Sequence, residues 1–191
     1  NDSLSNTKVQ PRIHSAKKTP LQDLVPVLTP ISAHIDVSSL CNFKCSFCFQ
    51  ADTKGMKEVG LKRGFMDPNL FKKIVDDMSK FPDKLKKIKI GNHGEPTMHP
   101  NLPDLIDYAK KSGIADIIEV FTNGSKLEPV LNRKIVEAGL QRINISLEGL
   151  SSERYLKVAK AKINWEEFVS NIKDLYDYSR KKGDLVIYVK V

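Results

Sequence analysis

Strand-like and helix-like segments alternate along the chain from residue 31 onward. Five apolar segments read as strands, over residues 31–37, 87–91, 117–121, 142–147 and 185–191. Strands that are separated by helices pair in parallel through right-handed crossovers. The sequence therefore predicts an α/β fold in which parallel strands form an open, curled sheet that helices cover.

Capping residues mark the ends of the expected helices. Asp67 followed by Pro68 is typical of an N-cap and a first helical residue, and Asn164 with Glu167 three residues later forms a capping box. Helices are expected from 68 onward, over 101–112, from 129 up to 139, and from 165 up to 183. The last helix carries an apolar stripe that indicates core packing: Trp165, Phe168, Val169, Ile172 and Leu175.

All three cysteines of the chain lie within eight residues, at Cys41, Cys45 and Cys48. Three thiolates can bind three irons of a [4Fe–4S] cluster and leave the fourth iron open, whereas closed iron–sulfur and zinc sites use four protein ligands. An odd number of cysteines packed this closely makes a poor disulfide framework, and reduced thiols fit a cytosolic redox poise. The spacing C-x3-C-x2-C therefore predicts a cluster with one open iron.

Polar and glycine-rich residues follow the expected strands at their carboxyl ends, where ligands bind in parallel α/β folds. They are the cysteines after the first strand, Gly94-Glu95-Pro96 after the second, Thr122-Asn123-Gly124 after the third, and Ser146 with Glu148 at the fourth. On the fourth strand, polar residues from Asn144 to Glu148 alternate with Ile143, Ile145 and Leu147. The polar set should line an inner cavity and the apolar set should face the helices. The alternative is an edge strand with one wet face.

These features resemble the radical SAM superfamily of S-adenosylmethionine (SAM) enzymes. The cysteine spacing is the family's, with the aromatic Phe47 before the third cysteine. Gly94-Glu95-Pro96 is similar to the family's Gly-Gly-Glu-Pro element, with His93 in place of its first glycine. The resemblance implies a partial (β/α)6 TIM-like barrel over 31–191, a [4Fe–4S] cluster on Cys41, Cys45 and Cys48, and SAM on the open iron. It further implies that the SAM-contacting residues are Phe47, Gly94, Glu95 and Ser146. Thr122 matches a substrate-contacting position of some relatives, and no residue is assigned a catalytic role.

The resemblance also implies the chemistry. An electron donor such as flavodoxin or ferredoxin reduces the cluster, and SAM is cleaved to methionine and a 5′-deoxyadenosyl radical. The radical takes hydrogen from an unidentified substrate, a peptide, a protein or a small metabolite. Ser-Leu-Glu-Gly at 146–149 is similar to the molybdenum-cofactor biosynthesis protein A-like and SPASM-type branch, whose members often carry further cysteines in a C-terminal extension. A fifth parallel strand at residue 191 would leave an open sheet edge. We therefore expect a longer enzyme that continues beyond this strand.

Two other functions stay open from the residues alone. A zinc-stabilised Cys3His module that binds RNA or protein could use His34, His93 or His99 as the fourth ligand. A degenerate SAM domain that acts only as a partner protein is the other alternative, and the intact three cysteines argue against it.

The net charge of +8 is spread as lysines over the expected helices and linkers, which indicates solvated surfaces. Basic residues do not alternate with aromatic ones, so the pattern does not indicate nucleic acid as a partner. Residues 1–30 are rich in Ser, Thr, Pro and Lys and are expected to form a flexible extension before the core domain. The chain shows neither a long apolar run nor a signal-like start, so a cytoplasmic location without membrane contact is expected.

Overall fold

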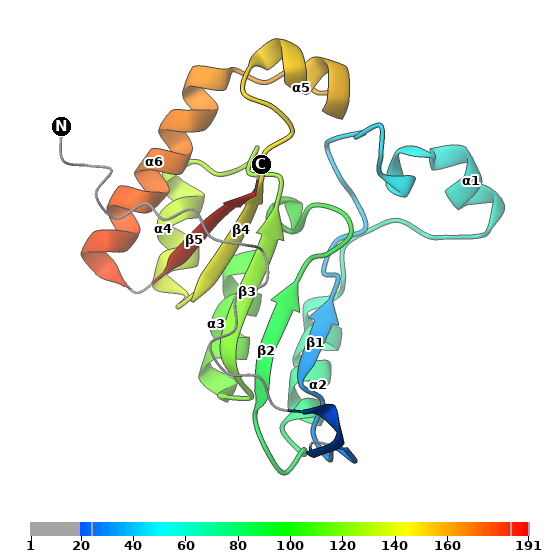
Figure 1. Ribbon diagram of the computed structural model, residues 1–191, viewed down its shortest axis with the longest axis vertical. Coiled ribbons are helices and arrows are strands. Elements are labelled where there is room, and N and C mark those ends of the chain that lie inside the picture. The colour runs from blue at the N-terminus through cyan, green and yellow to red at the C-terminus, as the bar shows by residue number, and fades with distance from the viewer. Residues whose placement is uncertain (1–19, 24, 184, 191) are drawn as a thin grey trace.

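Five parallel strands form one sheet in the computed structural model, which describes residues 20–190 except 24 and 184. The strands are β1 (Ser32–Ile35), β2 (Leu85–Ile90), β3 (Ala115–Thr122), β4 (Arg142–Ser146) and β5 (Val186–Lys190), and they lie in chain order across the sheet (Figure 1). Each neighbouring pair is parallel. The predicted order and direction of the strands are confirmed.

Helices connect the strands and cover one face of the sheet (Figure 1). The α-helices are α1 (Thr53–Glu58), α2 (Pro68–Met78), α3 (Leu102–Ser112), α4 (Pro129–Glu137), α5 (Ser152–Ala159) and α6 (Trp165–Lys182), and the short 3-10 helices are η1 (Leu21–Asp23), η2 (Phe49–Ala51) and η3 (Pro96–Met98). The Asp67 carboxylate accepts hydrogen bonds from the first turn of α2, and the Asn164 side chain accepts one from the Glu167 amide. These contacts confirm the predicted caps.

Two helices lie where the sequence does not predict them. α1 lies between the first predicted strand and the helix predicted from residue 68, where no helix is expected. α5 lies between the fourth strand and the last helix. Both are short, and tertiary burial rather than intrinsic propensity stabilises helices of this length. Met56 is the buried residue of α1, while Tyr155 and Ala159 are fully buried one turn apart on α5.

The apolar core lies between the sheet and its helical layer. Ile143 and Ile145 of β4 are fully buried, whereas Asn144 between them and Ser146 after Ile145 are only half-buried. The expected alternation on β4 is therefore present, with the apolar side chains on the helix-covered face. The α6 stripe is buried at Phe168 and Leu175, whereas Val169 at its margin is exposed.

The predicted extension over 1–30 falls mostly on residues that the structure does not describe, so the division into extension and core domain stays a prediction. Within the described residues, none of the helices combines the length and the apolar character that a membrane crossing requires.

Candidate metal centre and active site

The three cysteines lie in the loop between β1 and α1, and all three are half-buried. This loop runs beside the C-terminal end of α5, because the Lys44 amide donates to the Ala159 carbonyl at 2.8 Å and the Ser46 amide donates to the Val158 carbonyl at 2.9 Å. A further bond joins the Cys48 amide to the Cys45 carbonyl at 3.0 Å. The unpredicted helix α5 therefore helps to hold the cysteine loop in place.

Burial and mutual charge raise the pKa of two of the thiols. Burial raises the pKa of Cys41, and burial together with the charges of Glu148, Cys41 and Cys48 raises the pKa of Cys45 to about 12. Because Cys41 is affected by the charge of Cys48, and Cys45 by the charges of Cys41 and Cys48, the three thiols lie near one another on this loop. A bound cation would reverse this effect, since metal ligation removes the thiol proton.

The sulfur of Cys41 accepts hydrogen bonds that suit a thiolate ligand. The Phe43 amide lies 3.5 Å from this Sγ, and the side-chain amide of Asn123 lies 3.8 Å from it. Hydrogen bonds to ligating sulfur tune the potential of iron–sulfur clusters and orient the ligand. Three thiols on one loop, with hydrogen-bond donors around one sulfur, are therefore a donor set that fits an iron–sulfur cluster.

The Gly91–Glu95 turn after β2 packs directly against the start of the cysteine loop. Gly94 has a φ of 71°, and a Cβ atom there would lie 2.1 Å from the Ser38 carbonyl oxygen. Its amide donates to the Gln50 side chain at 2.6 Å, while the Glu95 amide donates to the Leu40 carbonyl at 2.7 Å. Only glycine permits both this conformation and this approach.

The Glu95 carboxylate is buried and joins two strand ends. Its Oε1 atom accepts hydrogen bonds from the amide and hydroxyl of Thr97 and from the Thr122 hydroxyl, and its Oε2 atom accepts one from the Asn123 amide at 2.7 Å. Burial raises the pKa of Glu95, and the four hydrogen bonds lower it. The side chain is thus occupied within the protein, and the backbone of the turn is the part of Gly94-Glu95 that remains for a ligand. Thr122 is buried and hydrogen-bonded to this carboxylate.

Asn123 contributes more to the site than its Asn-Gly turn signal indicates. Besides the bonds to Glu95 and Cys41, its side chain donates to the Asn42 side chain at 3.0 Å and accepts from Ser125. Through its backbone amide and its side chain together, this one residue links the loops that follow β1, β2 and β3. No residue pattern in a single sequence separates such a residue from an ordinary turn asparagine.

His93, the residue in place of the family's first glycine, is anchored by an acid from β1's end. The Asp36 carboxylate accepts the Asn92 and His93 amides at 2.6 and 3.0 Å, and it lies 2.8 Å from the His93 ring nitrogen. Burial raises the pKa of Asp36, but the two amide bonds outweigh it and bring this pKa below its usual value. His93 does not need a positive φ, so a side chain is tolerated at this position.

Two of the three histidines considered as zinc ligands are hydrogen-bonded to other residues. His99 is buried, with one ring nitrogen 2.9 Å from the Met66 carbonyl and the other accepting the Asn101 amide. His93 pairs with Asp36, and His34 is exposed on β1. In the described part of the chain, no three His, Cys, Asp or Glu side chains form a site for a single metal ion.

The remaining predicted residues lie around the same edge of the sheet. Ser146 is half-buried at the end of β4, and Phe47 is 69% exposed on the cysteine loop. Glu148 just beyond β4 is half-buried, and its amide donates to the Tyr155 hydroxyl at 3.3 Å. Since Glu148 raises the pKa of Cys45, the fourth strand end also reaches the cysteines. These residues thus follow four neighbouring parallel strands at one edge of the sheet, and their roles stay a prediction.

The face of the sheet away from the helices carries a charged network that the sequence does not single out. Register places Lys89, Glu119 and Arg142 side by side on β2, β3 and β4. Glu119 is 2% exposed, and its two carboxylate oxygens lie 3.4 Å from the Lys87 ammonium and 3.3 Å from the Arg142 guanidinium. Arg142 Nε and Asn144 Nδ2 are buried without a hydrogen-bond partner among the described residues. Donors of this kind are costly unless a ligand or further chain pairs with them.

Several curated proteins are similar in sequence. The chain is 35% identical over 117 residues to a tungsten-containing aldehyde ferredoxin oxidoreductase cofactor-modifying protein of Pyrococcus furiosus, covering 61% of this chain and 30% of that protein. It is 32% identical over 148 residues to a probable GTP 3′,8-cyclase of Methanocaldococcus jannaschii, covering 78% and 46% of the two. The chain thus spans between 30% and 46% of the length of these relatives.

Solved structures share the fold. Native anSMEcpe with bound AdoMet aligns with a TM-score of 0.61 at 18% identity, over 83% of this chain and 43% of that one. BtrN in complex with AdoMet and 2-DOIA aligns with a TM-score of 0.58 at 21% identity, over 84% and 56%. The predicted partial TIM-like barrel is confirmed. A family model described as the radical SAM superfamily matches residues 35–190. Together with the cysteine spacing and the strand-end loops, this match establishes that the chain belongs to the radical SAM superfamily.

Proposed function

We propose that the protein holds a [4Fe–4S] cluster on Cys41, Cys45 and Cys48 and cleaves SAM reductively. When bound, the group supplies one electron to the sulfonium of SAM, which gives methionine and a 5′-deoxyadenosyl radical that takes hydrogen from the substrate. The observation that carries the proposal is the grouping of all three cysteines of the chain on one loop that follows β1, where each is half-buried. Three sulfur ligands leave one iron for SAM.

The loops around the cysteines support a SAM site on the inner side of the cluster. The backbone of Gly94 and Glu95 is proposed to accept the SAM ammonium, because the Glu95 side chain is already bound by four donors. We propose that Ser146 contacts SAM from β4 and that the exposed Phe47 ring covers its adenine. Glu95, Thr122 and Asn123 then act as positioning residues that hold the loops in register.

We propose that the substrate binds on the sheet face opposite the helices. Asn144 and Arg142 precede Ser146 by two and four residues and therefore share its face of β4. Each presents a buried donor without a partner in the described residues. A polar substrate would satisfy these donors. The relatives' names, a cyclase of GTP and a cofactor-modifying protein, support a small metabolite, while SuiB, a structural neighbour, is solved with a precursor peptide. The relatives more similar in sequence favour the small metabolite.

The test is anaerobic reconstitution of the protein with iron and sulfide, followed by SAM and a reductant. We expect about four irons and four sulfides per chain, a change in the electron paramagnetic resonance spectrum of the reduced cluster when SAM is added, and release of 5′-deoxyadenosine. Cys41→Ala, Cys45→Ala and Cys48→Ala should each lose all three, while exposed Ser46→Ala should keep them.

Two results would contradict the proposal. One zinc per chain without sulfide would favour the metal-stabilised module instead. A full cluster whose spectrum SAM does not change would mean that the fourth iron is already bound by protein.

A further inference from the structure

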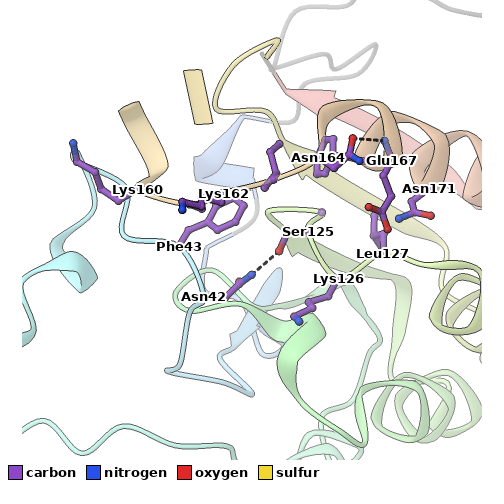
Figure 2. Close-up of a pocket in the computed structure, with 14 residues that line it drawn as sticks. Asn42, Phe43, Ser125, Lys126, Leu127, Lys160, Lys162, Asn164, Glu167 and Asn171 are labelled. Atoms are coloured by element: carbon purple, nitrogen blue, oxygen red, sulfur yellow. Dashed lines mark hydrogen bonds between the residues drawn. The ribbon is translucent and has the colours of Figure 1, made fainter. Parts of the chain in front are cut away.

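A cavity of about 460 Å³ lies beside the cysteine loop, at Asn42 and Phe43. Its wall is formed by Asn42 and Phe43 of this loop, by the loop after β3, and by the connection between α5 and α6 (Figure 2). The Asn42 side chain donates to the Ser125 hydroxyl at 2.7 Å across this wall. The cavity therefore shares part of its wall with the cysteine loop, while Gly94 and Ser146 are not among the residues that line it.

Lysines dominate the rim of this cavity. Lys126, Lys160 and Lys162 line it, and Glu167 is the one carboxylate among the residues that do. Figure 2 shows Lys126 on one side of the opening and Lys162 on the other. Lys44 and Lys157 continue the same surface, because Lys44 is bonded through its amide to the end of α5, where Lys157 lies in the last turn. These five residues are named here the outer lysine surface.

The charges of the outer lysine surface are not neutralised by the described protein. All five side chains are exposed, and none of them takes part in an ion pair or a side-chain hydrogen bond among residues 20–23, 25–183 and 185–190. Several lysines elsewhere, such as Lys73 and Lys111, do pair with acids one helical turn away. The surface therefore keeps its positive potential for an external partner.

Lys160 adds an independent observation. It closes α5 with a φ of 52° and is the one non-glycine residue of the described chain with a positive φ. Glycine is the residue that suits this helix-ending conformation. Sparsely populated backbone conformations at non-glycine residues cluster at functional sites, so the conformation of Lys160 supports a functional role for its exposed side chain.

We propose that the outer lysine surface is where an acidic one-electron carrier protein docks to reduce the cluster. The inference rests on the proposed function, because it needs a cluster on the cysteines. One electron leaves the reduced carrier, which is oxidised, and enters the cluster, which is reduced; no proton or bond is exchanged. Lys44 lies between Cys41 and Cys45 in the sequence, so a carrier on this surface contacts the loop that is proposed to hold the cluster.

The chemistry of the surface fits such a transient partner. Opposite charges steer the two proteins together and raise the association rate, while the contact can stay small enough for rapid release. RNA is the other polyanion that lysines attract. The carrier is favoured because the lysines surround the cysteine loop, where electrons must enter, and because aromatic side chains do not alternate with them as in a stacking platform.

The test uses the triple variant Lys126→Glu, Lys160→Glu and Lys162→Glu, and a matched triple Lys84→Glu, Lys134→Glu and Lys182→Glu on exposed lysines away from the cysteine loop. Both change the net charge by the same amount. The reconstituted proteins are mixed with reduced flavodoxin as the acidic carrier, and cluster reduction is followed by stopped-flow absorbance. Dithionite serves as the small-molecule reductant in parallel.

We expect the surface triple to lower the second-order rate constant with flavodoxin by about tenfold or more at low salt, and this difference should shrink as salt screens the charges. Reduction by dithionite, iron and sulfide content, and the matched triple should be unchanged. Equal rates with flavodoxin, an equal loss in the matched triple, or an equal loss with dithionite would overturn the docking surface. Weaker RNA binding of the surface triple with an unchanged flavodoxin rate would assign the surface to nucleic acid and also overturn it.

Failure of the proposed function is read separately, from the unmodified protein. If that protein assembles no cluster, the cysteine site is wrong whatever the lysines do. If it assembles a cluster that flavodoxin reduces equally well in all variants, only the docking surface is wrong.

Discussion

Replacing Glu95 by Gln tests whether a buried carboxylate holds the strand-end loops together. Four donors point at this carboxylate, and two of them are the backbone amides of Thr97 and Asn123. A Gln side chain keeps the shape, but its NH2 group would face one of these amides and the remaining hydrogen bonds would lose their charge. Losing one charge-assisted bond costs about 1.5–3 kcal/mol. The other hydrogen bonds to this side chain also weaken, and part of the loss is offset because the Gln side chain buries no charge. We therefore expect the free energy of unfolding to fall by roughly 3 kcal/mol.

The measurement is chemical and thermal unfolding of the cluster-free protein, followed by circular dichroism. For a chain of this length, roughly 3 kcal/mol corresponds to a fall in melting temperature of about 6–12 °C. Glu128→Gln is the matched control, because Glu128 is exposed at the start of α4 and makes no side-chain capping bond. That variant should stay within about 0.5 kcal/mol of the unmodified protein. If Glu95→Gln is equally neutral, Glu95 is protonated in the folded protein and the hydrogen-bond reasoning is wrong.

Three further predictions concern the same region. Gly94→Ala should destabilise the protein by roughly 2–4 kcal/mol and reduce cluster loading, because of its positive φ and a backbone oxygen 2.1 Å from the new Cβ. Gly64→Ala, in open space, is its control, and equal unfolding curves would refute the steric account. Burial and, next in size, the charge of Glu148 raise the pKa of Cys45 to about 12 in the folded apoprotein. In the unfolded chain the same thiol has a pKa near 9.0, so it loses its proton at a lower pH there. Apoprotein stability should therefore fall as pH rises across that interval, and alkylation of Cys45 should accelerate about tenfold per pH unit to at least pH 11, whereas a plateau near pH 9 would contradict the shift. Glu119→Gln removes the buried acid from the half-buried cations of Lys87 and Arg142 and should lower the free energy of unfolding in urea by roughly 2–4 kcal/mol; a change below about 0.5 kcal/mol would show that the network contributes little.

The strands and four of the helices were predictable because their signals are local. Asp67 before Pro68 caps α2 in the structure, and Gly113 ends α3 with a φ of 65°. The polar and apolar residues of β4 alternate and separate as expected. Periodicity and caps depend on neighbours in the chain, so a single sequence carries them. The helices α1 and α5 lack a long periodic stripe, and their existence depends on what Met56 and Tyr155 pack against.

The site was predictable in place but not in its internal contacts. The three cysteines and the strand-end loops are evident from spacing, since parallel strands bring their carboxyl ends to one edge. The use of the Glu95 side chain was not evident from the sequence. Two of its four donors belong to Thr97 in the same loop, but the other two belong to Thr122 and Asn123, which are at least 27 residues away. The same holds for Asn123, whose partners include Cys41 and Asn42 from the first loop.

The amino-acid sequence by itself determined the order of the strands and of four helices, the grouping of the three cysteines and the edge of the sheet that the strand-end loops share, because each of these depends on the spacing of nearby residues. Only the tertiary structure decided which side chains are free to act. It committed the Glu95 carboxylate to internal donors, placed Lys87 and Arg142 around a buried acid, and left the outer lysine surface without ion pairs among the described residues. Those outcomes depend on distances between residues far apart in the chain, and such distances exist only after the sheet has assembled.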